Sequence, residues 1–529
     1  MFIIKSQRKR ALGLNEPLKH GSHKKPVTRR DFLAQGFTTG AATVIVPAAV
    51  GMMSPRRAKA LTSDLENVAR NQCEITGGAG KIPFICFDLA GGANIAGSNV
   101  LVGQQGGQMD FLSTQGYSKL GLPGNMLPNN ATTNFVNTEF GLAFHSDSAF
   151  LRGMLEKTTP ATRAFVNGAV IAARSENDTG NNPHNPMYGI AKAGPLGKGA
   201  KGELLTLIGS QNSESGGNSM APAMMIDPAN RPTKIDRVSD VTGLVDTGDV
   251  ATILSASDTV RTLETMYRIT ETKLGHVDPG SAVANAAELE KRFRCAYLKT
   301  ADTVETFSDP ASLNPSLDPR ITNLFGANFG GDGEFQKTAS VMKLVIDGNA
   351  GAGTISMGGF DYHTGDRATG EARDLRAGRC IGACLEYAAQ TGRPVMIYVF
   401  SDGSLSSNGM VDDSVGGRGK GQWTGDNQQT AAAFFLVYNP QGRPTLIGEG
   451  TAAAARHQQI GYFSAGGDVV TSSSPAANNV NLLVQTVILN YMALHGEQGL
   501  FNGLFGNALG TGASLDGLIA FNQIVNGTI

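Results

Sequence analysis

The chain of 529 residues carries little charge. Lys, Arg, Asp and Glu make up 17% of it, below the roughly 25% that is usual in soluble proteins. The formal net charge is −1, so no general attraction to nucleic acid or to an anionic membrane surface is expected. Nucleic acid is therefore not expected as a partner.

Several common functional signatures are also missing. The sequence has no P-loop, no complete dinucleotide fingerprint and no Gly-x-Ser-x-Gly nucleophile elbow. After residue 60, no run is long and apolar enough to span a bilayer. The absence of these motifs disfavours a P-loop or dinucleotide-binding enzyme and an α/β-hydrolase, and the absence of an apolar span disfavours an integral membrane protein.

Cysteine is scarce, with five in the chain. Because five is odd, complete pairing within the chain is impossible. Cys380 and Cys384 are four residues apart on the apolar stripe of an expected helix, and Cys86 falls in an apolar strand. We expect these three to be small buried apolar residues rather than ligands.

The N-terminal 60 residues have the pattern of a signal peptide. The sequence TRRDFL contains Arg29 and Arg30, a mild apolar stretch covers 36–53, and the triplet AKA ends at Ala60. This order predicts export by the twin-arginine machinery, cleavage after Ala60, and a periplasmic or extracellular location. The alternative is an uncleaved membrane anchor, but the apolar stretch is barely long enough and rich in small residues. No stable membrane span is expected after cleavage.

The pattern of the remaining chain predicts an α/β protein. Unbroken apolar runs, as expected for strands buried on both faces, alternate with amphipathic helical stretches. Residues 61–529 are therefore expected to form one large α/β domain, with a mostly parallel central sheet and helices on both faces. The expected strands are 81–89, 354–357, 394–400 and 431–438, with a helix at about 371–390.

A different pattern occupies the middle of the chain. Apolar residues at helical spacing predict a helical segment at about 250–303, with Ser255 and Asp258 as a capping box. Residues 94–141 and 403–430 are read as long connections rich in Gly, Asn and Ser. The glycine-rich tail, about 497–529, is expected to form a surface flap.

Acidic residues follow several of the expected strands. Because the carboxyl ends of parallel strands meet at one edge of a sheet, these side chains are expected to gather there. Any one of them could simply cap a helix or satisfy a turn. Together they predict a site for one divalent ion such as Zn, Mn or Ca. The expected ligands are Asp88, Asp361, His363, Asp402 and Asp426.

These segments resemble a known family. The leader, a first strand that runs into Gly91-Gly92, and the sequence GGFDYH at 358–363 resemble the exported bacterial proteins catalogued as domain of unknown function 1501. Their fold is similar to that of the alkaline phosphatase and sulfatase superfamily, and the resemblance covers about residues 81–495. It implies a site with two metal ions held by Asp and His, and a serine or threonine nucleophile.

The chain departs from that pattern at three positions. Asn94 stands where the resemblance implies Asp, Pro183 stands next to His184 where it implies the nucleophile, and Asn427 stands where it implies His. Two hypotheses remain open. In one, the scaffold has lost its chemistry, and the exported domain binds an envelope partner, a glycan or a surface structure through its long neutral loops. In the other, it is a metal-dependent periplasmic hydrolase of phosphate or sulfate esters.

Overall fold

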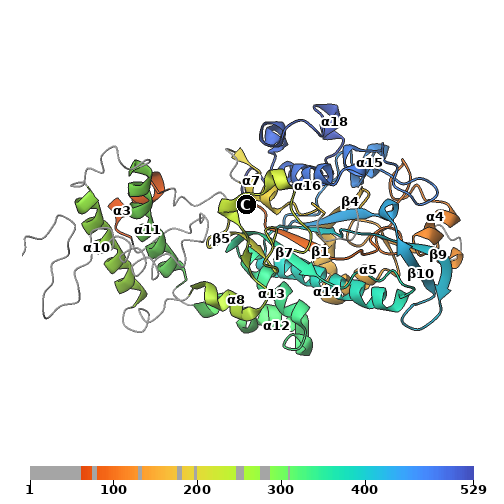
Figure 1. Cartoon of the computed structure of the whole chain (residues 1–529), viewed down its shortest axis with the longest axis horizontal. Helices are drawn as coiled ribbons and strands as arrows, with labels where there is room; N and C mark the ends of the chain where they lie inside the picture. The colour runs from red at the N-terminus through yellow and green to blue at the C-terminus, as the bar shows by residue number, and fades with distance from the viewer. Residues whose placement is uncertain are drawn as a thin grey trace, which may run out of the picture. The chain divides into compact units, whose positions relative to one another are not determined.

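The structure is a computed structural model that describes residues 61–73, 80–128, 134–175, 182–195, 199–245, 255–274, 286–307 and 310–529. The predicted leader, with Arg29, Arg30 and Ala60, lies outside these described residues. The described chain divides into two compact units. The smaller unit contains helices α3, α10 and α11, and the larger unit contains the other elements (Figure 1).

The smaller unit is a group of helices joined by a disulfide. Helix α10 (Ala256–Leu274) packs against α11 (Ala286–Thr306), which also contacts α3 (Ser63–Asn71). At the start of α10 the expected cap is present, because Asp258 N donates to Ser255 Oγ over 3.2 Å. Cys73 and Cys295 form a disulfide across a sequence separation of 222 residues. Helices α10 and α11 are observed in the described part of the predicted helical segment.

The larger unit is built on an eight-stranded sheet with the order β12-β4-β11-β8-β1-β7-β5-β6. β11 is antiparallel to both of its neighbours, whereas the other pairings in this sheet are parallel. The four expected strands correspond to β1, β7, β8 and β11, and the α/β class with a mostly parallel sheet is confirmed. The strands are β1 (Phe84–Leu89), β4 (Val166–Ala172), β5 (Leu205–Gly209), β6 (Thr233–Lys234), β7 (Ala350–Met357), β8 (Val395–Phe400), β11 (Ala432–Tyr438) and β12 (Gln459–Ile460).

Helices cover both faces of this sheet. One face is covered by a layer in which α14 packs on α5 and α13, and the other by α7 and α16, which contact each other (Figure 1). The central strands are therefore fully buried, as their unbroken apolar sequences predict. The helices of this unit are α4 (Thr114–Lys119), α5 (Ala149–Lys157), α6 (Pro160–Ala164), α7 (Met187–Lys192), α8 (Val238–Thr242), α12 (Pro319–Phe325), α13 (Gly333–Ile346), α14 (Arg367–Thr391), α15 (Ala452–Gln458), α16 (Val480–Leu494), α17 (Phe501–Phe505) and α18 (Ala513–Asp516).

Helix α14 is defined by its two ends. The side chain of Asp366 accepts a hydrogen bond from Thr369 N at 2.9 Å, which satisfies one of the free amides of the first turn. Gly392 ends the helix with φ of 66°, in the left-handed region that glycine adopts without a steric penalty. Cys380 and Cys384 on this helix and Cys86 in β1 are buried and form no disulfide, which confirms the expectation that all three are small buried residues.

Two segments differ from their expected form. Within the long connection at 403–430, strands β9 (Leu405–Asp412) and β10 (Lys420–Asp426) form an antiparallel hairpin that the sequence analysis does not predict. The side chain of Trp423, in β10, is buried and anchors this hairpin to the rest of the larger unit. In the tail, Phe501 and the run Leu518 to Phe521 are buried in the core rather than exposed on a flap. Apolar side chains between glycines are enough to anchor these segments.

Two short strands, β2 (Val136–Asn137) and β3 (Phe144–His145), form a second small antiparallel pair. Within the described residues, none of the helices is both long enough and apolar enough to pass through a bilayer.

Candidate metal centre

The loop between β7 and α14 carries the sequence GGFDYH, and it packs closely against the end of β1. Phe360 N donates to the carbonyl of Ala90 over 3.2 Å. A Cβ atom on Gly91, whose φ is 119°, would lie 2.9 Å from Asp361 N. Only glycine allows this approach. The glycine pair after β1 therefore positions Asp361 at the carboxyl edge of the sheet.

Tyr362 anchors the same loop. Its side chain is buried, and its hydroxyl donates to Oδ1 of Asp374 over 2.8 Å while accepting from Asn94 N at 3.2 Å. Oδ2 of Asp374 accepts from Nδ2 of Asn99 at 2.7 Å. Burial raises the pKa of Asp374 to about 7. Tyr362 N donates to the carbonyl of Phe360 over 3.0 Å, and in this turn the rings of Phe360 and Tyr362 are buried while the side chains of Asp361 and His363 remain open to solvent.

The third member of the site comes from the hairpin. Asp426 ends β10, where it pairs with Leu405 of β9. Gly365 N donates to the carbonyl of Trp423 over 2.6 Å, which joins the hairpin to the loop that carries His363. The position of Asp426 therefore depends on strand pairing that the sequence analysis did not predict.

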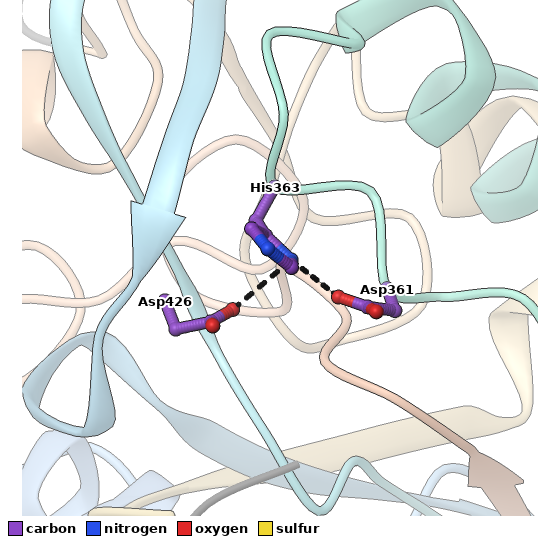
Figure 2. A group of neighbouring side chains, drawn as sticks. All are labelled: Asp361, His363 and Asp426. Carbon is purple, nitrogen blue, oxygen red and sulfur yellow. Dashed lines mark hydrogen bonds and ion pairs between the residues drawn. The ribbon is translucent and has the colours of Figure 1, made fainter.

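Asp361, His363 and Asp426 converge on one point (Figure 2). One potential ligand atom from each lies within 4.8 Å of the other two. Nδ1 of His363 contacts Oδ1 of Asp361 and lies 3.3 Å from Oδ1 of Asp426. The His363 side chain is 30% exposed and both carboxylates are 52% exposed, so the group opens to solvent. Two carboxylates and one imidazole fit a single divalent cation, with positions left for water or a ligand.

The structure does not add the other two expected ligands to this group. Asp402 is buried, and its Oδ1 accepts from Gly91 N at 2.8 Å, so it fixes the loop after β1. Asp88 is fully buried at the end of β1. Its carboxylate accepts from Asn218 N at 2.7 Å, from Ser356 Oγ at 3.0 Å and from Ser219 Oγ at 3.1 Å. Burial raises the pKa of Asp88. It holds the loop that follows β5.

Asn94, His184 and Asn427, which the family resemblance places near the site, make local contacts of their own. Oδ1 of Asn94 accepts from Ser98 Oγ at 2.7 Å, and its Nδ2 donates to the carbonyl of Ala96 at 3.1 Å. The ring of His184 is buried and stacks on Phe400 with centroids 5.8 Å apart. Burial lowers the pKa of His184 to about 4. The side chain of Asn427 accepts from Gln429 N at 2.8 Å and caps a short turn.

Sequence reasoning missed Tyr362 and Asp374, although both support the site. The alternation Asp361-Tyr362-His363, with one large aromatic residue between two polar ones, was the available signal. The family resemblance implies a hydroxyl nucleophile near His184, and Thr179, which is close to it in the sequence, lies outside the described residues. Comparison of the chain with protein-family models, with curated proteins and with solved structures finds no match.

Proposed function

We propose that this protein is an exported binding protein of the bacterial envelope that holds one divalent cation at Asp361, His363 and Asp426. The observation that carries the proposal is the convergence of these three side chains from two separate segments at the solvent-open edge of the sheet. The scaffold proposed is alkaline-phosphatase-like, with α10 and α11 as a helical insertion. Its partner is an envelope component or a small ester ligand.

Loss of the two-metal chemistry is supported by the residues around the cation site. Asn94 uses both polar atoms of its side chain within its own loop. Asn427 caps a turn with its side chain, and Pro183 has no nucleophilic atom. A second cation next to the first would need ligands at these positions, and an amide is a much weaker ligand than a carboxylate or imidazole.

Export is supported by a separate observation. The disulfide between Cys73 and Cys295 is of a kind that persists in oxidising compartments such as the periplasm and the cell exterior. This agrees with the location that Arg29, Arg30 and Ala60 predict.

Metal-dependent hydrolysis of a phosphate or sulfate ester is the second candidate function. It is favoured by the three-ligand, solvent-open arrangement, because catalytic metal sites keep a coordination position free. A divalent cation bound there would polarise an ester oxygen and activate water. Asp361, His363 and Asp426 would hold and orient the cation.

The deciding experiment is elemental analysis of protein purified from periplasm without chelators. We expect one zinc, manganese or calcium ion per chain, lost in His363→Ala and retained in the control His457→Ala, whose ring instead bonds the carbonyl of Ile519. A folded, metal-free wild type would contradict the proposal. Hydrolysis of aryl phosphates or sulfates that disappears in Asp361→Ala would favour the second candidate over the binding role.

A further inference from the structure

A buried carboxylate contacts the loop that carries Asp361 and His363. It belongs to Asp374, in the second turn of α14, and this residue is 3% exposed. Among the described residues, no lysine, arginine or histidine forms an ion pair with it, and Arg367 of the same helix pairs with Glu371 instead. An ionised carboxylate in such a place depends on hydrogen bonds for its stabilisation.

Two donors reach the carboxylate of Asp374 from two other segments. The hydroxyl of Tyr362 donates to Oδ1 over 2.8 Å, and Nδ2 of Asn99 donates to Oδ2 over 2.7 Å. Second contacts orient both donors. The Tyr362 hydroxyl accepts from Asn94 N at 3.2 Å, and Oδ1 of Asn99 accepts from Ser148 Oγ at 2.8 Å. Both groups therefore present a hydrogen to Asp374, an arrangement that suits an ionised carboxylate.

Protonation changes the hydrogen bonding of this carboxyl group. An ionised carboxylate only accepts hydrogen bonds, whereas a protonated carboxyl group also carries a donor. Both partners of Asp374 in the described chain, the hydroxyl of Tyr362 and Nδ2 of Asn99, already donate to it. In addition, a hydrogen bond to a charged acceptor is roughly twice as strong as one to a neutral acceptor. Protonation of Asp374 therefore weakens the contact between Tyr362 and α14.

The surroundings of Asp374 bring its change of charge close to neutral pH. Burial raises the pKa of Asp374 to about 7, and the negative charge of Glu371, one helical turn away, acts in the same direction. The two hydrogen bonds and the positive charge of Arg367 oppose this shift. Lys420 of β10 and Arg152 of α5 donate to Glu371 rather than to Asp374. The carboxyl group therefore takes up a proton in mildly acidic solution.

Tyr362 links this carboxyl group to the candidate metal ligands. Its ring lies so close to α14 that a Cβ atom on Gly370 would be 2.8 Å from Cε2 of the ring. In the sequence Tyr362 stands between Asp361 and His363, which share one loop (Figure 2). Because the bond from Tyr362 favours the ionised carboxylate, ionisation favours the bond by the same factor.

We propose that protonation of Asp374 loosens the loop that carries Asp361 and His363 and thereby weakens cation binding at mildly acidic pH. The effect on affinity rests on the proposed cation site. The loosening of the loop does not, because the chain from Asp374 through Tyr362 to the loop contains no metal ligand as an intermediate. The two parts can therefore be tested separately.

The first test is amide hydrogen exchange of residues 358–366 in the full chain with EDTA present, corrected for the intrinsic effect of pH on exchange. In the wild type we expect protection to fall about tenfold between about pH 8 and about pH 6, as the charged acceptor is lost. Asp374→Asn, which is neutral at both values, should show low protection at both. Tyr362→Phe should do the same, because it removes the bond and keeps Asp374. Trp423 emission verifies that each variant is folded.

The matched control is Glu386→Gln. Glu386 is another buried carboxylate of α14, but it accepts from Thr159 N at 2.9 Å and does not bond the loop. This variant should keep the wild-type difference between the two pH values. Equal protection of 358–366 at both pH values in the wild type, or a wild-type difference in Asp374→Asn, would overturn the inference.

The second test is calorimetric titration with MnCl2, ZnCl2 and CaCl2 in separate runs at the same two pH values. Between them, the Kd of the wild type should rise about tenfold more than that of Asp374→Asn. Protonation of His363 affects both proteins, so the difference between them isolates Asp374. An equal rise in both would overturn the effect on affinity. If none of the three cations binds but the exchange difference is present, the proposed cation site fails while the coupling of Asp374 to the loop is supported.

Discussion

The hydroxyl of Tyr362 donates to Oδ1 of Asp374 over 2.8 Å, and this bond ties the loop between Asp361 and His363 to helix α14. The same hydroxyl accepts a hydrogen bond from the backbone N of Asn94, which lies in the loop after β1. Two expected ligands are thus held in place by a buried residue that binds no metal itself.

Removing that hydroxyl should loosen the cation site. In Tyr362→Phe the ring still fills its buried position, so the fold persists, but a hydrogen bond to a carboxylate worth roughly 1.5–3 kcal/mol is lost. We expect cation affinity to fall about tenfold and amide hydrogen exchange of residues 358–366 to rise. Tyr398→Phe is the matched control, because its buried hydroxyl has no hydrogen-bond partner among the described residues. Equal exchange and affinity in the two variants would rule out this role for Tyr362.

Acid should destabilise the protein through His495. Its Nε2 accepts from Ile82 N at 3.0 Å and its Nδ1 donates to the carbonyl of Tyr491 at 2.8 Å, so the ring is held neutral. Burial lowers its pKa to about 3. Because the unfolded chain takes up a proton near pH 6.5 and the folded chain does not, stability is present above that pH and is lost as the pH falls towards 3.

The measurement is urea unfolding across this pH range. Each pH unit below about 6.5 should cost wild type up to roughly 1.4 kcal/mol from this histidine. His495→Gln should be less stable at pH 7, since the packed ring is lost, but should show a flatter pH dependence. His457→Gln should keep the wild-type slope. An unchanged slope in His495→Gln would assign the acid sensitivity to other groups.

Thiol titration should distinguish the two kinds of cysteine. Burial raises the pKa of Cys86 and of Cys380 to about 12 and that of Cys384 well above its usual value, so no reactive thiolate is exposed in the native chain. We expect no reaction in the native state, three thiols after denaturation without reductant, and five after denaturation with reductant. Five thiols without reductant would show that Cys73 and Cys295 are not bonded.

A buried carboxylate should be needed to neutralise the cations beneath the hairpin. Glu371 accepts from Arg367 at 2.7 Å, from Lys420 at 2.9 Å and from Arg152 at 2.7 Å, and it is only 5% exposed. Glu371→Gln leaves these cations without their main counter-charge and should destabilise the protein by roughly 3–5 kcal/mol.

Fluorescence can report this change directly. Trp423, the only tryptophan of the chain, has the Arg367 guanidinium 4.6 Å from its ring centroid. Its fluorescence emission should therefore change at a lower urea concentration in Glu371→Gln than in the wild type. Glu156→Gln removes a more exposed ion pair with Arg379 and should cost under about 1 kcal/mol. Similar unfolding midpoints for the two variants would contradict this assignment.

Unbroken apolar sequences made the central strands predictable. The run around Cys86 and the run that ends at Phe400 have few alternatives to a buried parallel strand, and both are observed as β1 and β8. The direction of β11 could not be read in the same way. A fully buried strand is equally apolar whether it runs parallel or antiparallel, and only the path of the connecting chain decides.

The candidate site was predictable in part for a similar reason. Asp361 and His363 are two residues apart, so local spacing places them together. Asp426 joins them through the pairing between β9 and β10. The sequence of this hairpin is rich in glycine and shows little alternation of apolar and polar residues, so it does not indicate the pairing. Asp88 and Asp402 also end strands, as expected, but hydrogen bonds from backbone amides and serine hydroxyls engage their carboxylates. Residue type and strand end do not distinguish a ligand from such a structural anchor.

The disulfide between Cys73 and Cys295 closes a covalent ring that includes β1, β4, β5 and β6. A protease that cuts the chain once between the two cysteines opens this ring without releasing a fragment, since both pieces remain linked through sulfur. Such a nicked molecule keeps its full mass on a non-reducing gel and separates into two bands only after reduction.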